Sequence, residues 1–288
     1  MVKRQGGKTK LNCRLIAFDL DGTFLDTAKN VPEKNLAALA AAAERGIYTV
    51  PATGRIYDGI PKALRELPFM RYYICINGAY VCDAAENAVI HRAEVPLETA
   101  LKFYEYMDGK PALYDCYQNG RGYMTRSMYD RAEEYIQDPG MLHLLKTLRV
   151  PVPELKAYLR EKGEDVQKLQ AYYADTAERD MELARLPAAF PELLFSTSVK
   201  NNIEVNYRTA GKGNGLAALC RHLGMDMADA VAIGDSSNDT DMLLAAGCGI
   251  AMANALPQVK DAADALTLSN DECGVADAIY RLILDKKI

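Results

Sequence analysis

The stretch that decides the fold is LIAFDLDGT, residues 15–23. Its first four residues are apolar without interruption, which is typical of a strand buried on both faces, and Asp-Leu-Asp-Gly then follows as a tight loop. Two carboxylates two residues apart, directly after a buried strand, can point into one cleft. One of them could act as a nucleophile and the other as a general acid and base. Taken alone, the same four residues also suit an ordinary turn, because Asp and Gly favour turns.

The residues on either side of this stretch alternate between short apolar runs and helical patterns. Apolar residues recur at i, i+3, i+4 and i+7 between Pro32 and Arg45, and Gly46 follows, which predicts a helix. Strands are predicted at residues 47–50, 72–76, 231–233 and 249–252, and further helices at 216–223, 239–246 and 275–284. Short strands joined through helices indicate a parallel sheet covered on both faces.

The middle of the chain has a different pattern. Residues 112–117, Asn119-Gly120 and residues 123–125 predict a β-hairpin, and further strands are predicted at 167–173 and 194–199. The run Pro151-Val152-Pro153 is expected to break the segment. We therefore expect an α/β protein with a Rossmann-like parallel-sheet core domain, residues 1–84 and 199–288, and a smaller inserted α+β domain, residues 85–198.

Composition excludes several classes of protein. The 288 residues are 49% hydrophobic and 25% charged, which excludes general disorder, and the net charge of −5 excludes broad binding to nucleic acid or an anionic membrane. No apolar run is long enough to span a membrane, and the basic start, Met1 to Lys10, lacks a signal-peptide core. Seven scattered cysteines and three separated histidines form no zinc pattern. We expect a cytoplasmic protein without nucleic-acid or membrane partners.

Three further segments place reactive groups after predicted strands or at the start of a helix. They are Thr53-Gly54-Arg55, Lys212-Gly213 and the run GDSSND at residues 234–239. Each has a plain structural reading: a turn, a solvated charge and a helix N-cap, respectively. Together with Asp-Leu-Asp-Gly they follow one order, at spacings that suit one edge of a parallel sheet, where open α/β sheets bind ligands. The joint occurrence favours one shared site over four unrelated structural features, and Thr53-Gly54-Arg55 offers a hydroxyl and amides suited to a phosphate.

With these residues the sequence resembles the haloacid dehalogenase-like superfamily, and within it the Cof-type phosphatases that carry a large α/β cap. The resemblance extends from about Arg14 to the end of the chain and is weakest in the middle domain. It rests on the motifs DLDGT at 19–23, TGR at 53–55, NGA at 77–79, KG at 212–213, GDSSND at 234–239 with ML at 242–243, GIAMANA at 249–255 and SND at 269–271. The middle domain would then be the cap.

The resemblance implies a magnesium-dependent phosphatase that acts on small phosphorylated metabolites, such as sugar phosphates or phosphorylated cofactors. Asp19 would be the nucleophile that forms an aspartyl phosphate, and Asp21 the general acid and base. Lys212 and Asp239 would complete the catalytic set, with Asp239 supporting the metal shell. The phosphoryl group would be bound by Leu20, Thr53, the amide of Gly54, Lys212 and Asn238. Mg²⁺ would be held by the carboxylates of Asp19 and Asp235 and the carbonyl of Asp21.

Two alternative functions stay open at this point. A phosphomutase on the same fold would move a phosphoryl group within its substrate, and only the cap would distinguish it. A receiver-like signalling module would be phosphorylated on an aspartate, although such a module has no need for the inserted domain. The substrate, the cap residues that contact it and the oligomeric state cannot be read from the sequence.

Overall fold

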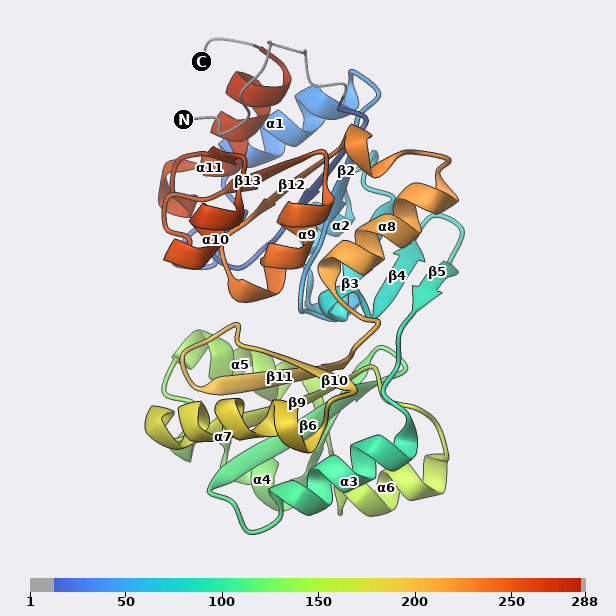
Figure 1. The fold of residues 1–288 in the computed structure, drawn as a ribbon, viewed down its shortest axis with the longest axis vertical. Helices are drawn as coiled ribbons and strands as arrows, with labels where there is room; N and C mark the ends of the chain where they lie inside the picture. The colour runs from blue at the N-terminus through green and yellow to red at the C-terminus, as the bar shows by residue number, and fades with distance from the viewer. Residues whose placement is uncertain (1–12, 286–288) are drawn as a thin grey trace. The chain divides into compact units, whose positions relative to one another are not determined.

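Residues 13–285 of the protein are described by a computed structural model, and they form two compact units (Figure 1). Within the described residues, the first unit comprises the chain up to Gly54, then Ile60–His91, and then the chain from Gly211 onward. The second unit comprises Arg55–Gly59 and Arg92–Ala210. Along the chain, the second unit is therefore inserted into the first. The basic start, Met1 to Lys10, lies outside the described residues.

The core of the first unit is a parallel sheet with strand order β14-β13-β12-β1-β2. Its strands are β1 (Leu15–Phe18), β2 (Tyr48–Pro51), β12 (Ala230–Gly234), β13 (Cys248–Ala251) and β14 (Ala265–Leu266). All residues of β1 and β12 are buried, as expected for a strand covered on both faces. The expected fold class, a Rossmann-like parallel sheet with an inserted α+β domain, is confirmed.

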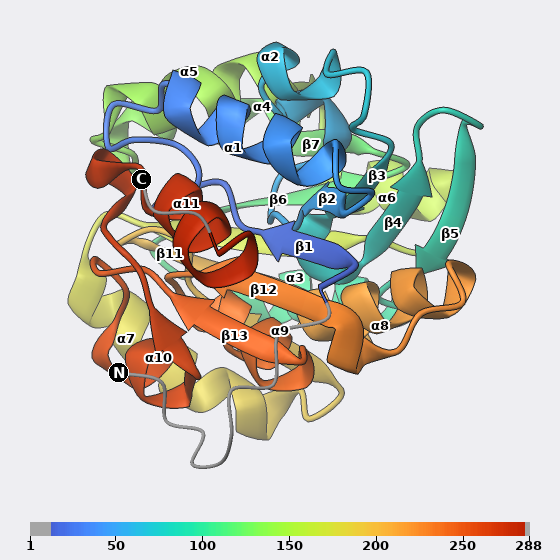
Figure 2. The ribbon, with the colours of Figure 1, turned by 90° about the horizontal axis from the view of Figure 1, so that it is seen from above.

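Helices cover both faces of this sheet (Figure 2). Helix α1 (Glu33–Ala43) packs against α11 (Gly274–Asp277) on one face, and α8 (Lys212–His222) packs against α9 (Thr240–Ala245) on the other. The predicted helix at 275–284 is interrupted, because after α11 the chain continues as a π-helical turn, Ala278–Ile283. The unit also contains α2 (Lys62–Arg65) and α10 (Pro257–Ala262). Across residues 13–285, no helix combines the length and apolar character that a membrane span requires.

A second, antiparallel sheet in this unit corrects one prediction. The strand expected at 72–76 is β3 (Tyr72–Cys75), and it pairs with β4 (Tyr80–Asp83), which precedes β5 (Ala88–Arg92) in a three-stranded sheet. A single parallel bridge, between Ala52 and Ile74, connects β3 to the chain just after β2. A short buried apolar run has the same pattern in a parallel and an antiparallel sheet, so the run alone could not distinguish them.

The second unit is built on a six-stranded sheet with strand order β10-β11-β9-β6-β7-β8. Its strands are β6 (Ala112–Gln118), β7 (Arg121–Thr125), β8 (Arg149–Val152), β9 (Lys168–Tyr173), β10 (Leu193–Ser196) and β11 (Asn202–Tyr207). Its helices are α3 (Leu97–Met107), α4 (Arg126–Asp130), α5 (Pro139–Leu148), α6 (Leu155–Lys162) and α7 (Thr176–Ala189). Alternate residues of β6 divide between two apolar clusters, with Tyr114 in the larger and Leu113 in the smaller. The sheet therefore has packed side chains on both faces.

The predicted hairpin is confirmed, while two other predictions in this unit are wrong or incomplete. Asn119 and Gly120 have φ of 51° and 73°, which is the geometry of a tight two-residue hairpin turn. Pro151 does not break the segment, because β8 is an edge strand and an edge tolerates a residue that donates no ladder hydrogen bond. Strand β11 was not predicted, although its residues alternate between apolar and polar types.

Candidate active site

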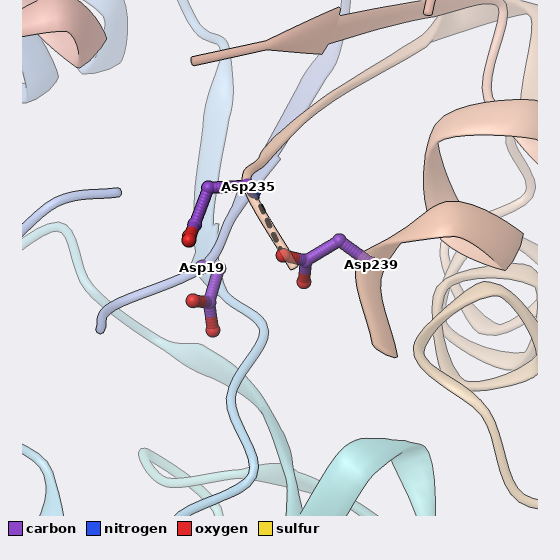
Figure 3. A group of neighbouring side chains, drawn as sticks. All are labelled: Asp19, Asp235 and Asp239. Atoms are coloured by element: carbon purple, nitrogen blue, oxygen red, sulfur yellow. Dashed lines mark hydrogen bonds between the residues drawn. The ribbon is translucent and has the colours of Figure 1, made fainter. Parts of the chain in front are cut away.

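Two neighbouring strands bring three carboxylates together. Strands β1 and β12 are parallel and in register, with Phe18 opposite Ile233, so the residues that follow them emerge at the same edge of the sheet. Asp19 follows β1, Asp235 follows β12, and Asp239 ends the short 3-10 turn Ser237–Asp239. One oxygen from each of these carboxylates lies within 4.8 Å of the others (Figure 3). The predicted meeting of the motifs at 19–23 and 234–239 is found in the structure.

A buried lysine lies between two of these carboxylates. Lys212 is the first residue of α8, and its side chain is 0% exposed. Its Nζ donates to Asp19 Oδ1 and to Asp239 Oδ1, each at 2.6 Å. Charge-assisted hydrogen bonds of this kind are among the strongest in proteins. They fix the Asp19 carboxylate from one side.

The cluster holds more negative charge than the lysine balances. Burial raises the pKa of Asp19 well above its usual range, and neighbouring carboxylates raise it further, while Lys212 only partly opposes the shift. Burial, reinforced by Asp239, raises the pKa of Asp235 to about 6. For Lys212 burial disfavours the charge, but attraction to the carboxylates outweighs it and the pKa is raised. An added cation would relieve this repulsion between carboxylates.

Two hydroxyl groups and a glycine fix the position of Asp235. Thr23 Oγ1 donates to Asp235 Oδ1 at 2.7 Å, and Ser236 Oγ donates to Oδ2 at 3.0 Å. A Cβ on Gly22 would lie 2.6 Å from Asp235 Oδ2, and Gly22 has φ of 80°. Glycine is therefore required at this position both for space and for backbone conformation.

Asp239 differs from the other two carboxylates in its hydrogen bonds. Its Oδ2 accepts from the amides of Asp235 and Ser236, each at 2.9 Å, and its Oδ1 accepts from Lys212. Both oxygens are thus engaged within the protein, and Asp239 shapes the loop and holds the lysine. Asp19 and Asp235 are the two carboxylates that fit a hard cation, since all-oxygen sites are typical of Mg²⁺.

Asp21 and Leu20 lie in the same loop but make other contacts. The Asp21 side chain is 33% exposed, and its Oδ1 accepts from Lys29 Nζ at 2.8 Å. Leu20 is buried, and its carbonyl accepts from the amides of Thr23 and Leu25. The loop is therefore closed on itself by backbone hydrogen bonds, and the two aspartates of the motif have different surroundings.

Thr53 and Asn238 are linked through a loop that carries no assigned role in the sequence-based prediction. Thr53 is buried after β2; its amide donates to the carbonyl of Ile74, and its carbonyl accepts from the amide of Asn77. Asn238 Nδ2 donates to Asn77 Oδ1 at 3.1 Å, and Asn238 Oδ1 is buried without a hydrogen-bond partner. Gly54 follows Thr53 in the chain. The turn containing Asn77, which has φ of 54°, thus connects two predicted phosphate-binding residues.

Two further residues, which sequence reasoning missed, form hydrogen bonds with the loop or helix that carries a site residue. Lys29 bonds Asp21, and Asp241 Oδ2 accepts from the amide of Gly213 at 2.9 Å, at the start of the helix that carries Lys212. Neither residue belongs to a recognisable pattern. The only available signal was that Asp241 lies two residues beyond the run GDSSND.

Comparisons with known proteins agree with this arrangement. A sequence profile of the haloacid dehalogenase-like hydrolases matches residues 16–279. Phosphatase YwpJ of Bacillus subtilis is 28% identical over 94% of this chain and 100% of its own length. HMP-PP phosphatase of Escherichia coli K12 is 30% identical over 86% of each chain. The structure of a haloacid dehalogenase-like hydrolase from B. subtilis covers 93% of this chain and 99% of its own, with a TM-score of 0.78 and 28% identity.

The family match includes all three carboxylates of the cluster, the whole of β12 and all of β1 except Leu15. The relatives are phosphatases by name, so the expected enzyme class, a haloacid dehalogenase-like phosphatase, is confirmed. Because the profile matches residues 16–279, nearly the whole chain, the protein belongs to the haloacid dehalogenase-like hydrolases.

Proposed function

We propose that the protein is a magnesium-dependent phosphatase that hydrolyses small phosphorylated metabolites through an aspartyl-phosphate intermediate. One observation carries the proposal: Lys212 Nζ holds both Asp19 and Asp239 at 2.6 Å, beside the carboxylate of Asp235. A fixed carboxylate beside a buried ammonium group suits attack on a phosphate monoester, because phosphoryl transfer depends mainly on positioning and charge neutralisation.

In the first half-reaction, a carboxylate oxygen of Asp19 attacks the phosphorus atom. The bond from phosphorus to the ester oxygen breaks, and the carboxyl group of Asp21 gives its proton to that leaving oxygen. Lys212 has three ammonium protons, of which two bond Asp19 and Asp239. The third can donate to a phosphoryl oxygen. The product is an alcohol and a phosphorylated Asp19.

In the second half-reaction, water attacks the phosphorus atom of the aspartyl phosphate. Asp21, now ionised, takes a proton from this water as the bond from phosphorus to the Asp19 oxygen breaks. Inorganic phosphate leaves, and Asp19 returns to its carboxylate form. Asp21 therefore ends the cycle protonated, as it began.

The donor set fits Mg²⁺, with the carboxylates of Asp19 and Asp235 and the carbonyl of Asp21 as the residues that would hold it. When bound, the ion would supply positive charge that offsets the phosphoryl oxygens and the paired carboxylates. Asp239 would support the site by holding the amides of Asp235 and Ser236.

We assign phosphate binding to Thr53, the amide of Gly54, Lys212 and Asn238, together with Leu20 in the nucleophile loop. Asn238 donates its Nδ2 to Asn77 and leaves its buried Oδ1 without a partner. A half-turn of this amide would present its NH₂ group, the donor that a phosphoryl oxygen needs. We also propose that the second unit is the cap domain, which excludes water from the intermediate.

For the substrate we propose a small phosphorylated metabolite, either a sugar phosphate or a phosphorylated cofactor. The E. coli relative, 30% identical, is named HMP-PP phosphatase, which makes HMP-PP a substrate to test first. Sugar phosphates belong in the same panel, because a sequence identity of 30% does not establish that two enzymes share a substrate.

The test is release of inorganic phosphate from a panel of phosphate monoesters and HMP-PP by purified protein, with Mg²⁺ or with excess chelator. We expect turnover of at least one small phosphorylated metabolite, only when Mg²⁺ is present. Rapid quenching with labelled substrate should leave label on Asp19, released by hydroxylamine as expected for an acyl phosphate. Asp19→Asn serves as the matched control.

Two outcomes would favour the alternatives. Conversion of a sugar phosphate to its isomer without phosphate release would indicate a mutase. Stable phosphorylation of Asp19 without turnover of any monoester would indicate a receiver-like signalling role. Full turnover in excess chelator would contradict the metal assignment.

A further inference from the structure

A hydrogen-bonded turn follows the nucleophile loop at residues 26–30. Asp26 accepts from the amide and side chain of Asn30 at 2.7 and 3.0 Å, its carbonyl accepts from Lys29 N at 2.9 Å, and its amide donates to Asn30 O at 3.2 Å. Within the turn Lys29 has φ of 66°, a left-handed conformation that is uncommon for a residue with a Cβ. This fixed backbone sets the direction in which the Lys29 side chain leaves the turn.

The turn is also anchored to residues 270 and 271, which lie far from it in the sequence but in the same unit. Thr27 donates from both its amide and its hydroxyl to the two carboxylate oxygens of Asp271, each at 2.8 Å. Asn270 Nδ2 donates to the carbonyl of Leu25 at 3.1 Å. Residues on both sides of Lys29 are therefore held in place, so that the turn forms a fixed base for the side chain.

From this base Lys29 reaches back to the nucleophile loop. Its Nζ donates to Asp21 Oδ1 at 2.8 Å, with side-chain exposures of 48% for Lys29 and 33% for Asp21. An ion pair this exposed contributes little to stability. Its main effect is on the position of the Asp21 carboxyl group.

We propose that Lys29 is a positioning residue that holds the carboxyl group of Asp21 in the orientation from which it exchanges a proton with the leaving oxygen. The inference rests on the proposed function, in which Asp21 is the general acid and base. Without the ammonium group, the Asp21 side chain would lose this hydrogen bond, and fewer molecules would hold it in the productive rotamer. Lys29 acts through Asp21 and does not itself touch the reacting atoms.

The test compares two substrates that need the proton to different degrees. An alkyl phosphate has a poor leaving group and depends on Asp21, whereas p-nitrophenyl phosphate releases p-nitrophenolate, which leaves without a proton. We expect Lys29→Met, which keeps the length of the side chain but not its charge, to lower kcat/KM about tenfold for the alkyl phosphate and less than about twofold for the aryl phosphate. Lys29→Arg should recover most of the loss. The melting temperature should shift by less than about 2 °C.

Two controls separate this inference from the proposed function itself. Lys62→Met removes another exposed lysine of an ion pair, with Glu66, and should change neither rate. In an Asp21→Asn background, Lys29→Met should have no further effect. If Asp21→Asn leaves the ratio of alkyl to aryl rates unchanged, the proposed role of Asp21 fails. If Asp21→Asn changes this ratio but Lys29→Met does not, or if the two losses are additive, the role of Lys29 is overturned.

Discussion

Each unit of the protein contains a cluster of buried charges, and the two clusters are built differently. In the first unit, Lys212 is bonded to Asp19 and Asp239, with Asp235 beside them. In the second, Arg149 Nε donates to Asp115 at 2.6 Å, and Lys168 Nζ donates to Glu204 at 3.0 Å. All four partners in the second cluster are less than 5% exposed at their side chains.

The second cluster is organised across the strands of one sheet. Asp115 of β6 lies opposite Gln170 of β9, which lies opposite Glu204 of β11. Gln170 accepts from Arg149 at 2.9 Å and donates to Glu204 at 3.1 Å, so that it connects the two ion pairs. The pairs therefore lie side by side on a single face of the sheet.

The balance of charge distinguishes the two clusters. Three carboxylates face one cation in the first unit, while two carboxylates face two cations in the second. In a balanced buried cluster, every charged group has a partner of opposite charge within the protein. Removing one partner leaves the other charge buried and unpaired, which is strongly destabilising. The unbalanced cluster has carboxylates with raised pKa values, and a further cation would offset its surplus of negative charge. This surplus of negative charge is the feature on which we base the proposal that the first cluster is the reactive one.

The largest expected effect is on catalysis in the unbalanced cluster. Asp19→Asn should lower phosphatase activity by at least about 10³-fold, because an amide is a poor nucleophile. The melting temperature should stay the same or rise, because burial raises the pKa of Asp19 and the folded state therefore disfavours its charge. Activity and thermal unfolding should be measured on the same preparation. Retention of more than a few per cent of activity would show that water attacks the substrate directly.

The corresponding change in the balanced cluster should affect stability instead. Arg149→Met leaves Asp115 buried without its cation, and Asp115 Oδ1 already lacks a hydrogen-bond partner. We expect a loss of about 3–5 kcal/mol in the free energy of unfolding, measured by urea denaturation. A double variant, Arg149→Met with Asp115→Leu, should recover much of this loss. If the single variant is as stable as the wild type, the pair is not the balanced structural element described here.

The two clusters also differ in how well the sequence predicts them. The meeting of Asp19 and Asp235 was predictable, because each follows a buried apolar run that is typical of a parallel strand. The tight turn at Asn119-Gly120 was equally predictable, because both residues accept positive φ. These features depend on a few adjacent residues, and their signals are therefore local.

The other features of the two clusters depend on contacts between segments that lie far apart in the sequence. Lys212 could be placed at the start of a helix, but its bonds to Asp19 and Asp239 depend on how three elements pack. Arg149 and Asp115 lie on strands that are not neighbours in the sequence, and neither belongs to a motif. A lone arginine is normally solvated, so nothing in its local sequence marks it as buried. Such long-range pairing is set by the sheet order.

A smaller effect is expected in the pH dependence of stability. The pKa of Asp235 is raised to about 6 in the folded protein, so the folded state binds this proton more tightly than the unfolded state, whose pKa is near 3.9. The contribution of Asp235 to stability should therefore fall as pH rises from about 4 to about 6, and stay constant above that. The size of the change is at most about 3 kcal/mol.

This prediction is best measured as a difference. Urea unfolding of the metal-free wild type and Asp235→Asn, compared at several pH values, isolates the contribution of this carboxylate. Wild type should lose stability relative to the variant as pH rises through this window. A parallel or opposite trend would mean that burial and Asp239 do not raise the pKa of Asp235 in the folded protein.

The smallest expected effect concerns the helix that carries Lys212. The residue before α8 is Gly211, which has no side chain to cap the helix, and Asp241 supplies the missing acceptor through its bond to the amide of Gly213. A Cβ on Gly211 would lie 2.5 Å from Asp241 Oδ2, so the glycine leaves room for the Asp241 side chain to cap the helix. Asp241→Ala should therefore cost about 1 kcal/mol of stability.

Because Lys212 is the first residue of α8, the same change should also lower kcat severalfold, and this distinguishes it from an ordinary cap. The matched control is Asp175→Ala, which removes the cap of α7 in the second unit, where Asp175 Oδ1 accepts from the amide of Ala177 at 2.8 Å. That variant should lose a similar amount of stability without a change in kcat. Asp241→Asn keeps an acceptor oxygen and should recover most of the activity. If Asp241→Ala and Asp175→Ala lose stability equally and both keep full kcat, the start of α8 holds Lys212 in place without help from Asp241.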